Sequence, residues 1–168
     1  MMRARWAAFR HPRLTIGAGT QLSGKLVVGG KGRVVIGPRC EIKSAVLWPL
    51  QADSVVTIGA ECYLNGVEVA ARHSVRIGDR CELGTALVYD TDFHSVQRVP
   101  RGEVKSAPIV IEDDVWLAAR TAVLRGVTIG ARSVVGIGVV VSRSVGPDTL
   151  LRVVEPRASR LGEAVTQQ

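Results

Sequence analysis

Residues able to transfer protons gather in one segment of the chain. His94 closes the stretch Asp-Thr-Asp-Phe-His, four residues after Asp90 and two after Asp92. An imidazole titrates near neutral pH and can act as a general base, and a nearby carboxylate can orient its ring. Asp90 and Asp92 could also hold the molecule being modified, or merely cap the turn. The other histidines, His11 and His73, lie outside this segment.

The elements that carry His94 follow from a six-residue repeat. This period matches neither a helix nor an alternating strand, but it fits a coil with three flat faces and sharp corners. Three hexads then make one triangular turn, with the aliphatic residue pointing inward and successive coils stacked as parallel strands. The repeat is clearest at Ile111, Leu117, Val123, Ile129, Val135 and Val141. An all-β solenoid over residues 14–153 is expected, after a basic segment 1–13 and before a tail or short helix 154–168.

Two breaks in the repeat predict loops. From Ile77 to Ile111 the chain is one coil plus 16 residues long, so a polar loop is expected to protrude near residues 89–107 with His94 in it. From Ile36 to Ile58 there are four residues more than one coil, which predicts an outward bulge over Trp48–Asp53. Long polar excursions from a rigid scaffold are common places for function.

Composition narrows the class of protein. The chain has 168 residues, enough for one domain, and is 46% hydrophobic but only 4% aromatic, as expected for a narrow prism without room for rings. Its net charge is +7, yet the arginines are scattered without a basic run or stacking aromatics, which argues against a nucleic-acid partner. No apolar stretch approaches the ~20 residues of a membrane span. Three cysteines without a Cys-x-x-Cys pair, each four residues after a repeat isoleucine, predict reduced core thiols in a cytoplasmic protein.

The run from Ile111 to Gly130, with Val-Trp-Leu-Ala-Ala-Arg at its centre, resembles the hexapeptide-repeat acyltransferases. It is most similar to sugar O-acetyltransferases of the galactoside, maltose, capsule and colanic-acid types. The resemblance implies a left-handed parallel β-helix and a homotrimer, with acetyl-CoA bound between neighbouring prisms. It further implies direct acetyl transfer to a saccharide hydroxyl, with His94 as the general base.

The same resemblance implies further site residues. Asn65 would bind the acceptor and assist catalysis, although Asn65-Gly66 is also a plausible corner turn. The backbone amide of Ala119 would stabilise the thioester oxyanion, and Trp116 would lie beside the acceptor. Expected contacts to CoA come from backbone groups and basic side chains: Ala118, Gly136, Ile137, Gly138, Ser142, Arg143, Arg157 and Arg160.

Three other functions remain open from the sequence. An N-acyltransferase of an amino sugar or nucleotide sugar would use the same fold and also need a base. A metal enzyme of the γ-carbonic-anhydrase kind would need three histidine ligands, but His11, His73 and His94 are expected on separate turns, so no metal is expected. A non-catalytic β-helix acting as an assembly scaffold is the third alternative.

Overall fold

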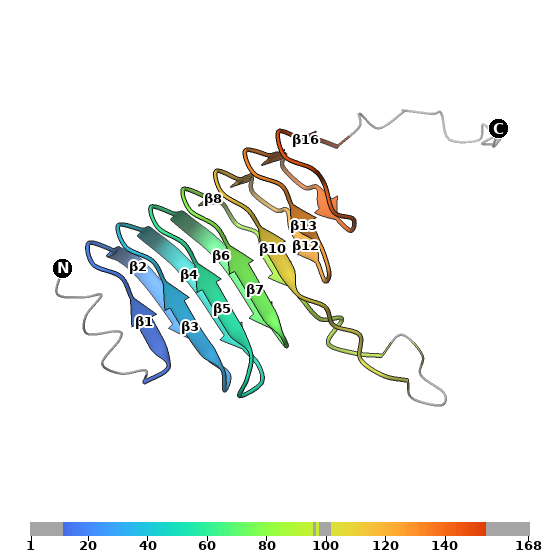
Figure 1. Cartoon of the computed structure of the whole chain (residues 1–168), viewed down its shortest axis with the longest axis horizontal. Helices are drawn as coiled ribbons and strands as arrows, with labels where there is room; N and C mark the ends of the chain where they lie inside the picture. Colours follow the sequence, from blue (N-terminus) through green and yellow to red (C-terminus); the bar gives the residue numbers. More distant parts are fainter. Residues whose placement is uncertain (1–11, 96, 98–101, 154–168) are drawn as a thin grey trace, which may run out of the picture.

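The computed structural model describes residues 12–95, 97 and 102–153, and every regular element within them is a β-strand (Figure 1). The chain winds as a coil whose turns stack along one axis. The strands are β1 Leu14–Ile16, β2 Gln21–Val28, β3 Arg33–Ile36, β4 Glu41–Pro49, β5 Val55–Ile58, β6 Tyr63–Ala71, β7 Ser74–Ile77, β8 Glu82–Leu83, β9 Leu87–Tyr89, β10 Ile109–Ile111, β11 Trp116–Leu117, β12 Ala122–Leu124, β13 Thr128–Ile129, β14 Val134–Val135, β15 Val140–Val141 and β16 Leu150–Leu151.

The strands form three faces of a prism. Face one is the six-stranded parallel sheet β1-β3-β5-β7-β10-β13. The ten-stranded sheet bends into faces two and three, because β6 pairs with β8 through Tyr63 and Leu64 and with β9 through 68–70. Face two continues through β11, β14 and β16, and face three through β12 and β15. The predicted all-β parallel β-helix is confirmed, and its stacking is consistent with the left-handed coil implied by the resemblance.

The three edges of the prism are its corners. The first corner joins face one to face two, the second joins face two to face three, and the third returns the chain to face one. At the second corner β6 changes partner from β8 to β9, and at the third corner the chain leaves β9 before it enters β10.

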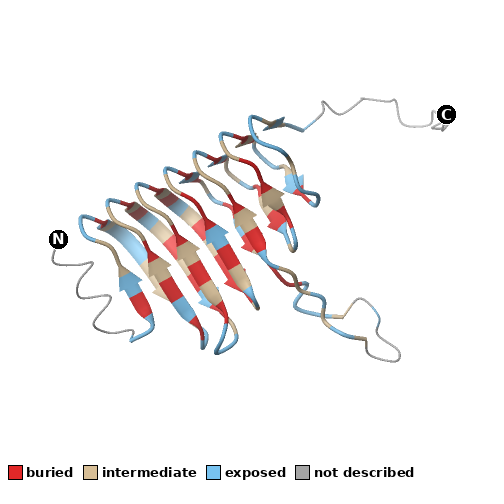
Figure 2. Ribbon diagram, in the orientation of Figure 1, coloured by how far each residue is buried: buried red, intermediate tan, exposed pale blue. Residues whose placement is uncertain are grey.

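The repeat aliphatics fill the prism. All six side chains of the hexad series from Ile111 to Val141 are buried, and along most strands buried residues alternate with intermediate or exposed ones (Figure 2). Removing a Val, Leu or Ile side chain from water stabilises the fold by roughly 1.5–3 kcal/mol. None of the described aromatic residues is fully buried, so the rings lie on the outside of the prism.

The three cysteines lie in the core, as the sequence predicts. They occupy one position in successive coils, and each thiol donates to a carbonyl of the next coil, as Cys40 Sγ does to Gly59 O at 3.1 Å and Cys62 Sγ to Gly78 O at 3.1 Å. The contact with the Cys62 side chain and burial both raise the pKa of Cys40, which keeps this thiol protonated at neutral pH.

The expected bulge over Trp48–Asp53 is wrong in its first part. Trp48 and Pro49 belong to β4, with Trp48 in register with Ala70 and 42% exposed on face three. The ring lies over Gly29, where an added Cβ would come within 2.8 Å of the indole nitrogen. The turn starts only at Gln51, where the Ser54 hydroxyl donates to the Gln51 carbonyl at 2.8 Å.

The predicted loop near residues 89–107 is confirmed. It leaves the prism at the third corner between β9 and β10 and extends away from the stacked coils (Figure 1). Its base is a short antiparallel neck in which Thr91 bridges Ser106. Asp92 N–H donates to Lys105 O at 3.0 Å, and Ala107 N–H donates to Asp90 O at 2.9 Å. The expected C-terminal tail lies outside the described residues.

Candidate functional site

Backbone hydrogen bonds link successive coils at the first corner. Each coil has a residue with positive φ there, whose N–H donates to a carbonyl of the preceding coil; Arg80 N–H donates to Ala60 O at 2.8 Å and Arg132 N–H to Asp113 O at 2.9 Å. Arg80 also forms a hydrogen-bonded ion pair with Asp114 at 2.7 Å. The non-glycine residues with positive φ at this corner are Arg39, Glu61, Arg80, Asp114, Arg132 and Asp148.

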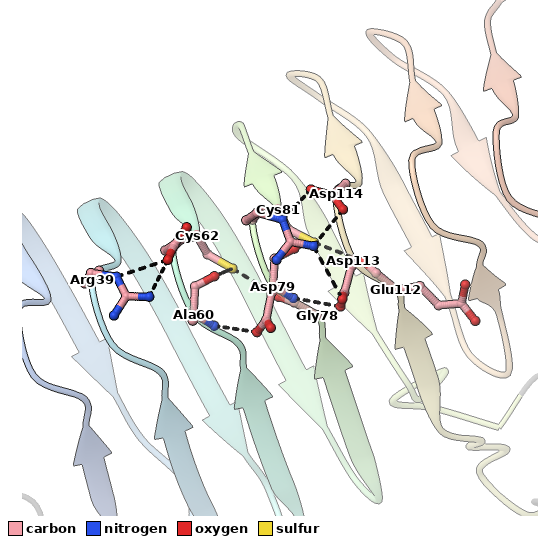
Figure 3. Close-up of polar contacts among 11 residues, drawn as sticks. Arg39, Ala60, Cys62, Gly78, Asp79, Cys81, Glu112, Asp113 and Asp114 are labelled. Carbon is pink, nitrogen blue, oxygen red and sulfur yellow. Dashed lines mark hydrogen bonds and ion pairs between the residues drawn. The ribbon is translucent and has the colours of Figure 1, made fainter.

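Carboxylates cap the N–H groups that come just before these positive-φ residues. Ala60 N–H donates to Asp79 Oδ1 at 2.7 Å and Asp79 N–H donates to Asp113 Oδ1 at 3.0 Å (Figure 3). Ala131 N–H donates to Glu112 Oε2 at 2.8 Å. Asp113 N–H has no such cap in the described part of the chain, but the surrounding carboxylates would repel an added negative charge. Two coils have proline at the same position, Pro38 and Pro147.

The second corner repeats this backbone pattern without the carboxylates. Arg120 N–H donates to Thr85 O at 2.6 Å, and Gly138 N–H donates to Ala119 O at 3.1 Å. Arg120 and Gly138 have φ of 61° and 73°, so Ala119 and Ile137 match the capped positions of the first corner. Over residues 12–95, 97 and 102–153, the N–H groups of Thr85, Ala119 and Ile137 have no hydrogen-bond acceptor. The second corner therefore offers a row of backbone donors, one from each of three coils.

These donors suit a ligand that carries carbonyl groups along its length. A backbone N–H needs no protonation change to stabilise negative charge on a carbonyl oxygen, and it is fixed before the ligand binds. Beside the row, the Ile137 side chain is 65% exposed and offers an apolar surface. Three of the backbone N–H groups expected to contact ligand are instead used within the β-helix, namely those of Ala118, Gly136 and Gly138.

Two other predicted side chains lie close to this row in the fold. Trp116, on β11 of face two, is 51% exposed and in register with Glu82 and Val134. Asn65 is exposed at the second corner, just before Gly66 with φ of 91°. The positive φ of Gly66 agrees with the corner-turn interpretation of Asn65-Gly66, and the turn presents the Asn65 amide to solvent.

His94 belongs to the third corner. Its side chain is exposed two residues beyond the neck of the protruding loop. The backbone N–H of His94 donates to Asp92 O at 2.6 Å. No hydrogen bond or ion pair of the imidazole is formed with any other described residue. In a single chain the predicted base and the second-corner donors therefore lie on different corners of the prism.

The two loop carboxylates have different environments. Asp90 is fully buried and accepts hydrogen bonds from the backbone N–H groups of Arg72 at 2.5 Å and His73 at 2.7 Å. It caps the third corner of the preceding coil, which is the turn-capping alternative that the sequence left open. Asp92 is partly exposed and pairs with Arg125 at 2.9 Å.

The remaining predicted residues lie toward the C-terminal end. Ser142 and Arg143 are exposed directly after β15, and Arg157 and Arg160 lie outside the described residues. Among the residues that are described, no group of three or more His, Cys, Asp or Glu side chains could hold a metal ion. The same residues include no helix long and apolar enough to cross a membrane.

Thr85 and Arg125 are not among the residues that the sequence singles out. Thr85 takes the place of Ala119 one coil earlier, but a free backbone N–H leaves no mark in a sequence. Arg125 lies 33 residues from Asp92, so its pairing depends on the length of the loop and the register of β9 with β12.

Comparison with known proteins agrees with the repeat and the fold. The family model for the hexapeptide repeat of succinyl-transferase matches residues 108–143, which span the clearest part of the six-residue series. The chain contains hexapeptide repeats over these residues. The resemblance to hexapeptide-repeat acyltransferases that the sequence predicts is thereby confirmed.

Curated and solved proteins similar to this chain include several acetyltransferases. It is 31% identical to the galactoside O-acetyltransferase of Escherichia coli K12 over 110 residues, which are 64% of this chain and 54% of that protein. A hexapeptide-repeat-containing acetyltransferase of Vibrio cholerae O1 biovar eltor, complexed with acetyl coenzyme A, matches with a TM-score of 0.56 at 29% identity over 88% of this chain and 71% of that one. The chain spans about half the length of the curated relatives that it matches.

A more distant structure agrees in fold alone. A mutant of AntD, an N-acyltransferase from Bacillus cereus, complexed with dTDP-4-amino-4,6-dideoxyglucose and coenzyme A, has a TM-score of 0.73 at 19% identity. The match covers 89% of this chain and 84% of AntD. Proteins that share this fold therefore include an N-acyltransferase as well as O-acetyltransferases.

Proposed function

We propose that this protein is an acetyl-CoA-dependent O-acetyltransferase that acts on a saccharide hydroxyl, with His94 as the general base. The observation that carries the proposal is the row of uncapped N–H groups at the second corner, which contrasts with the carboxylate-capped first corner. The acetyltransferase names of the relatives, and the acetyl coenzyme A bound to one of them, agree with this use of the fold.

The reaction needs a general base and a donor that stabilises the charge on the carbonyl oxygen. An alcohol attacks a thioester only as its proton is removed, and the exposed His94 imidazole accepts that proton. The hydroxyl oxygen bonds to the carbonyl carbon, and Ala119 N–H donates to the oxyanion that forms. When the carbon–sulfur bond breaks, His94 returns the proton to the leaving sulfur. The products are an acetyl ester and free CoA, without a covalent enzyme intermediate.

The acetyl-CoA chain runs along the second corner in this proposal. Ile137 N–H, one coil beyond Ala119, donates to an amide carbonyl of the pantetheine arm, and the exposed Ile137 side chain packs against its apolar part. Ser142 and Arg143 lie farther toward the C-terminal end, where the nucleotide phosphates would be. Asn65 and Trp116 are proposed to bind the acceptor, whereas the Asp92 carboxylate pairs with Arg125. Asp90 is not assigned a ligand, because its carboxylate is buried and caps two backbone N–H groups.

A homotrimer is part of the proposal. His94 leaves the prism at the third corner, whereas Asn65 and Ala119 lie at the second corner. A neighbouring copy in a symmetric trimer can bring its His94 loop to the second corner of this chain, so each site would use two subunits. A cytoplasmic location is proposed on the three reduced thiols of the core.

Two exposed histidines in the described part of the chain, His73 and His94, allow a matched experiment. Wild type, His94→Ala and His73→Ala are assayed with acetyl-CoA and a panel of saccharides by following CoA release. Loss of a general base typically costs about 10²–10⁴-fold in kcat, so His94→Ala is expected to fall in this range while binding acetyl-CoA normally. His73→Ala is expected to keep wild-type activity, because His73 contributes only its backbone N–H to a described side-chain hydrogen bond.

Each other outcome has a definite meaning. Full activity of His94→Ala would refute the role of His94. Acetylation of amino sugars alone would replace the O-acetyltransferase with the N-acyltransferase alternative. A stable trimer that binds no CoA in calorimetry would overturn the proposed enzyme and support the scaffold.

A further inference from the structure

One ion pair joins the protruding loop to the next coil of the prism. Arg125, in the turn after β12, donates from Nε to Asp92 Oδ1 at 2.9 Å. The side chains of Arg125 and Asp92 are only 35% and 31% exposed, whereas the ion pairs of the first corner involve side chains that are 40–64% exposed. Solvent therefore screens the Arg125–Asp92 pair less than those pairs.

Asp92 connects this ion pair directly to His94. Its carbonyl oxygen accepts the N–H of His94 at 2.6 Å, and its own N–H donates to Lys105 O at 3.0 Å. Asp92 thus pairs with Arg125 through its side chain and accepts the backbone N–H of His94 through its carbonyl oxygen. A displacement of Asp92 would move His94 with it.

The residue between them is held in an uncommon conformation. Phe93 has φ of 57°, which is unfavourable for a bulky side chain unless surrounding contacts fix it. Its ring packs edge-to-face on Tyr89 at a centroid distance of 5.2 Å, and the Tyr89 hydroxyl donates to Glu68 Oε1 at 2.7 Å. Burial and this contact with Glu68 raise the pKa of Tyr89, so the hydroxyl remains a donor at neutral pH.

The turn that carries Arg125 is itself tied to the neck of the loop. Gly126 N–H donates to Ala107 O at 3.0 Å, and Ala107 N–H donates to Asp90 O at 2.9 Å. The backbone of the turn that carries Arg125 is therefore hydrogen-bonded to the neck, so the arginine starts from a fixed point beside the loop.

We infer that Arg125 is a positioning residue for His94 and acts through the carboxylate of Asp92. This inference rests on the proposed function, since it concerns the placement of the proposed base. It replaces the expected assignment of Asp92 to acceptor binding, because Asp92 Oδ1 already accepts a hydrogen bond from Arg125 Nε. Arg125 itself never touches substrate. It reduces the range of positions that His94 occupies before the acceptor arrives.

A double-mutant cycle distinguishes positioning of His94 by Asp92 from binding of the acceptor by Asp92. Arg125→Met keeps the apolar stem of the side chain and removes the charge, and Asp92→Asn removes the partner. A misplacement of about 1 Å can cost about 10²-fold in rate, so each variant is expected to lower kcat by about 10–10²-fold with little change in the acceptor KM. The double variant is expected to be no slower than the slower single variant, and Arg125→Lys to recover part of the rate.

A control variant and the contrary outcomes complete this cycle. Arg76→Met, which removes an exposed arginine from β7 on face one, is expected to keep wild-type kinetics. Multiplying effects of the two single variants, or a rise in acceptor KM for Asp92→Asn alone, would refute the positioning role and return Asp92 to acceptor binding.

Hydrogen exchange tests whether Arg125 holds the His94 loop in place, and it needs no catalytic assay. Arg125→Met is expected to speed amide exchange of residues 92–95 at least several-fold while leaving face one unchanged; Arg76→Met is expected to change neither. Unchanged exchange in Arg125→Met would overturn the inference. If Arg125→Met exchanges faster but the wild-type protein transfers no acetyl group, Arg125 still holds the loop in place and only the proposed function is overturned.

Discussion

Replacing Ala119 with proline would remove one backbone N–H and little else. This N–H is the proposed donor to the oxyanion, and it has no other acceptor among the described residues. A side-chain substitution cannot test a backbone donor, whereas proline lacks the N–H altogether.

The structure indicates that proline fits at this position. Ala119 comes just before Arg120, which has φ of 61°. At the first corner, Pro38 and Pro147 hold the same place before residues with φ of 57°. The carbonyl of Ala119, which accepts Gly138 N–H, is retained in the variant.

The expected loss can be estimated from the chemistry of the site. Removing one oxyanion donor typically lowers kcat by about 10²–10³-fold, or about 2.7–4 kcal/mol of transition-state stabilisation. Steady-state release of CoA measures kcat, calorimetry measures acetyl-CoA affinity, and thermal melting measures the fold. Ala119→Pro is expected to lose rate while affinity and melting temperature change little.

A matched proline at the first corner supplies the control. Ala131→Pro removes an N–H that donates to the Glu112 carboxylate in the same local geometry before Arg132. It is expected to lose at most a little stability and no activity. A folded Ala119→Pro protein with wild-type kcat, or an equal loss of kcat in both variants, would refute the proposed oxyanion donor.

Two further predictions concern the buried thiols of the core and the Arg132–Asp148 ion pair of the first corner. The native protein is expected to leave all three thiols unreactive toward a colorimetric disulfide reagent and to expose three thiols in guanidinium, because Cys40, Cys62 and Cys81 are buried; a fast-reacting thiol in the native state would contradict this packing. The hydrogen bond from Arg132 lowers the pKa of Asp148 below its unfolded value near 4, so this carboxylate stabilises the fold above that pH and loses the effect as pH falls through its folded pKa. Asp148→Asn should therefore melt lower than wild type at pH 7, with the two curves converging in acid; a difference that does not depend on pH would count against the ion pair.

The fold could be predicted because the repeat is periodic in side chains. Leu117 and its hexad partners specify the inward face, and the excess between Ile77 and Ile111 locates the loop. The bulge predicted at Trp48 is misplaced because a strand can continue past a corner when its outward ring lies over a glycine, here Gly29. Counting residues gives the length of such an excess but not the point where the strand ends.

The candidate site is predictable only in part. His94 stands out because its residue type and its loop both suggest chemistry. Asp90 and Asp92 look alike in sequence, yet one is buried as a cap and the other pairs with Arg125, since their side chains take different directions at the neck. The free N–H of Ala119 depends on which side chains the next coil supplies, and no sequence pattern records a missing cap.

Mass spectrometry of the acceptor after incubation with acetyl-CoA tests the central claim most directly. Wild type is expected to place an acetyl ester on a saccharide hydroxyl, with one free CoA for each ester, and His94→Ala to form the same product at least about 10²-fold more slowly. A saccharide panel that stays unmodified while CoA binds, an acetylated amine in place of an ester, or an equal rate in His94→Ala would contradict the proposed O-acetyl transfer by His94.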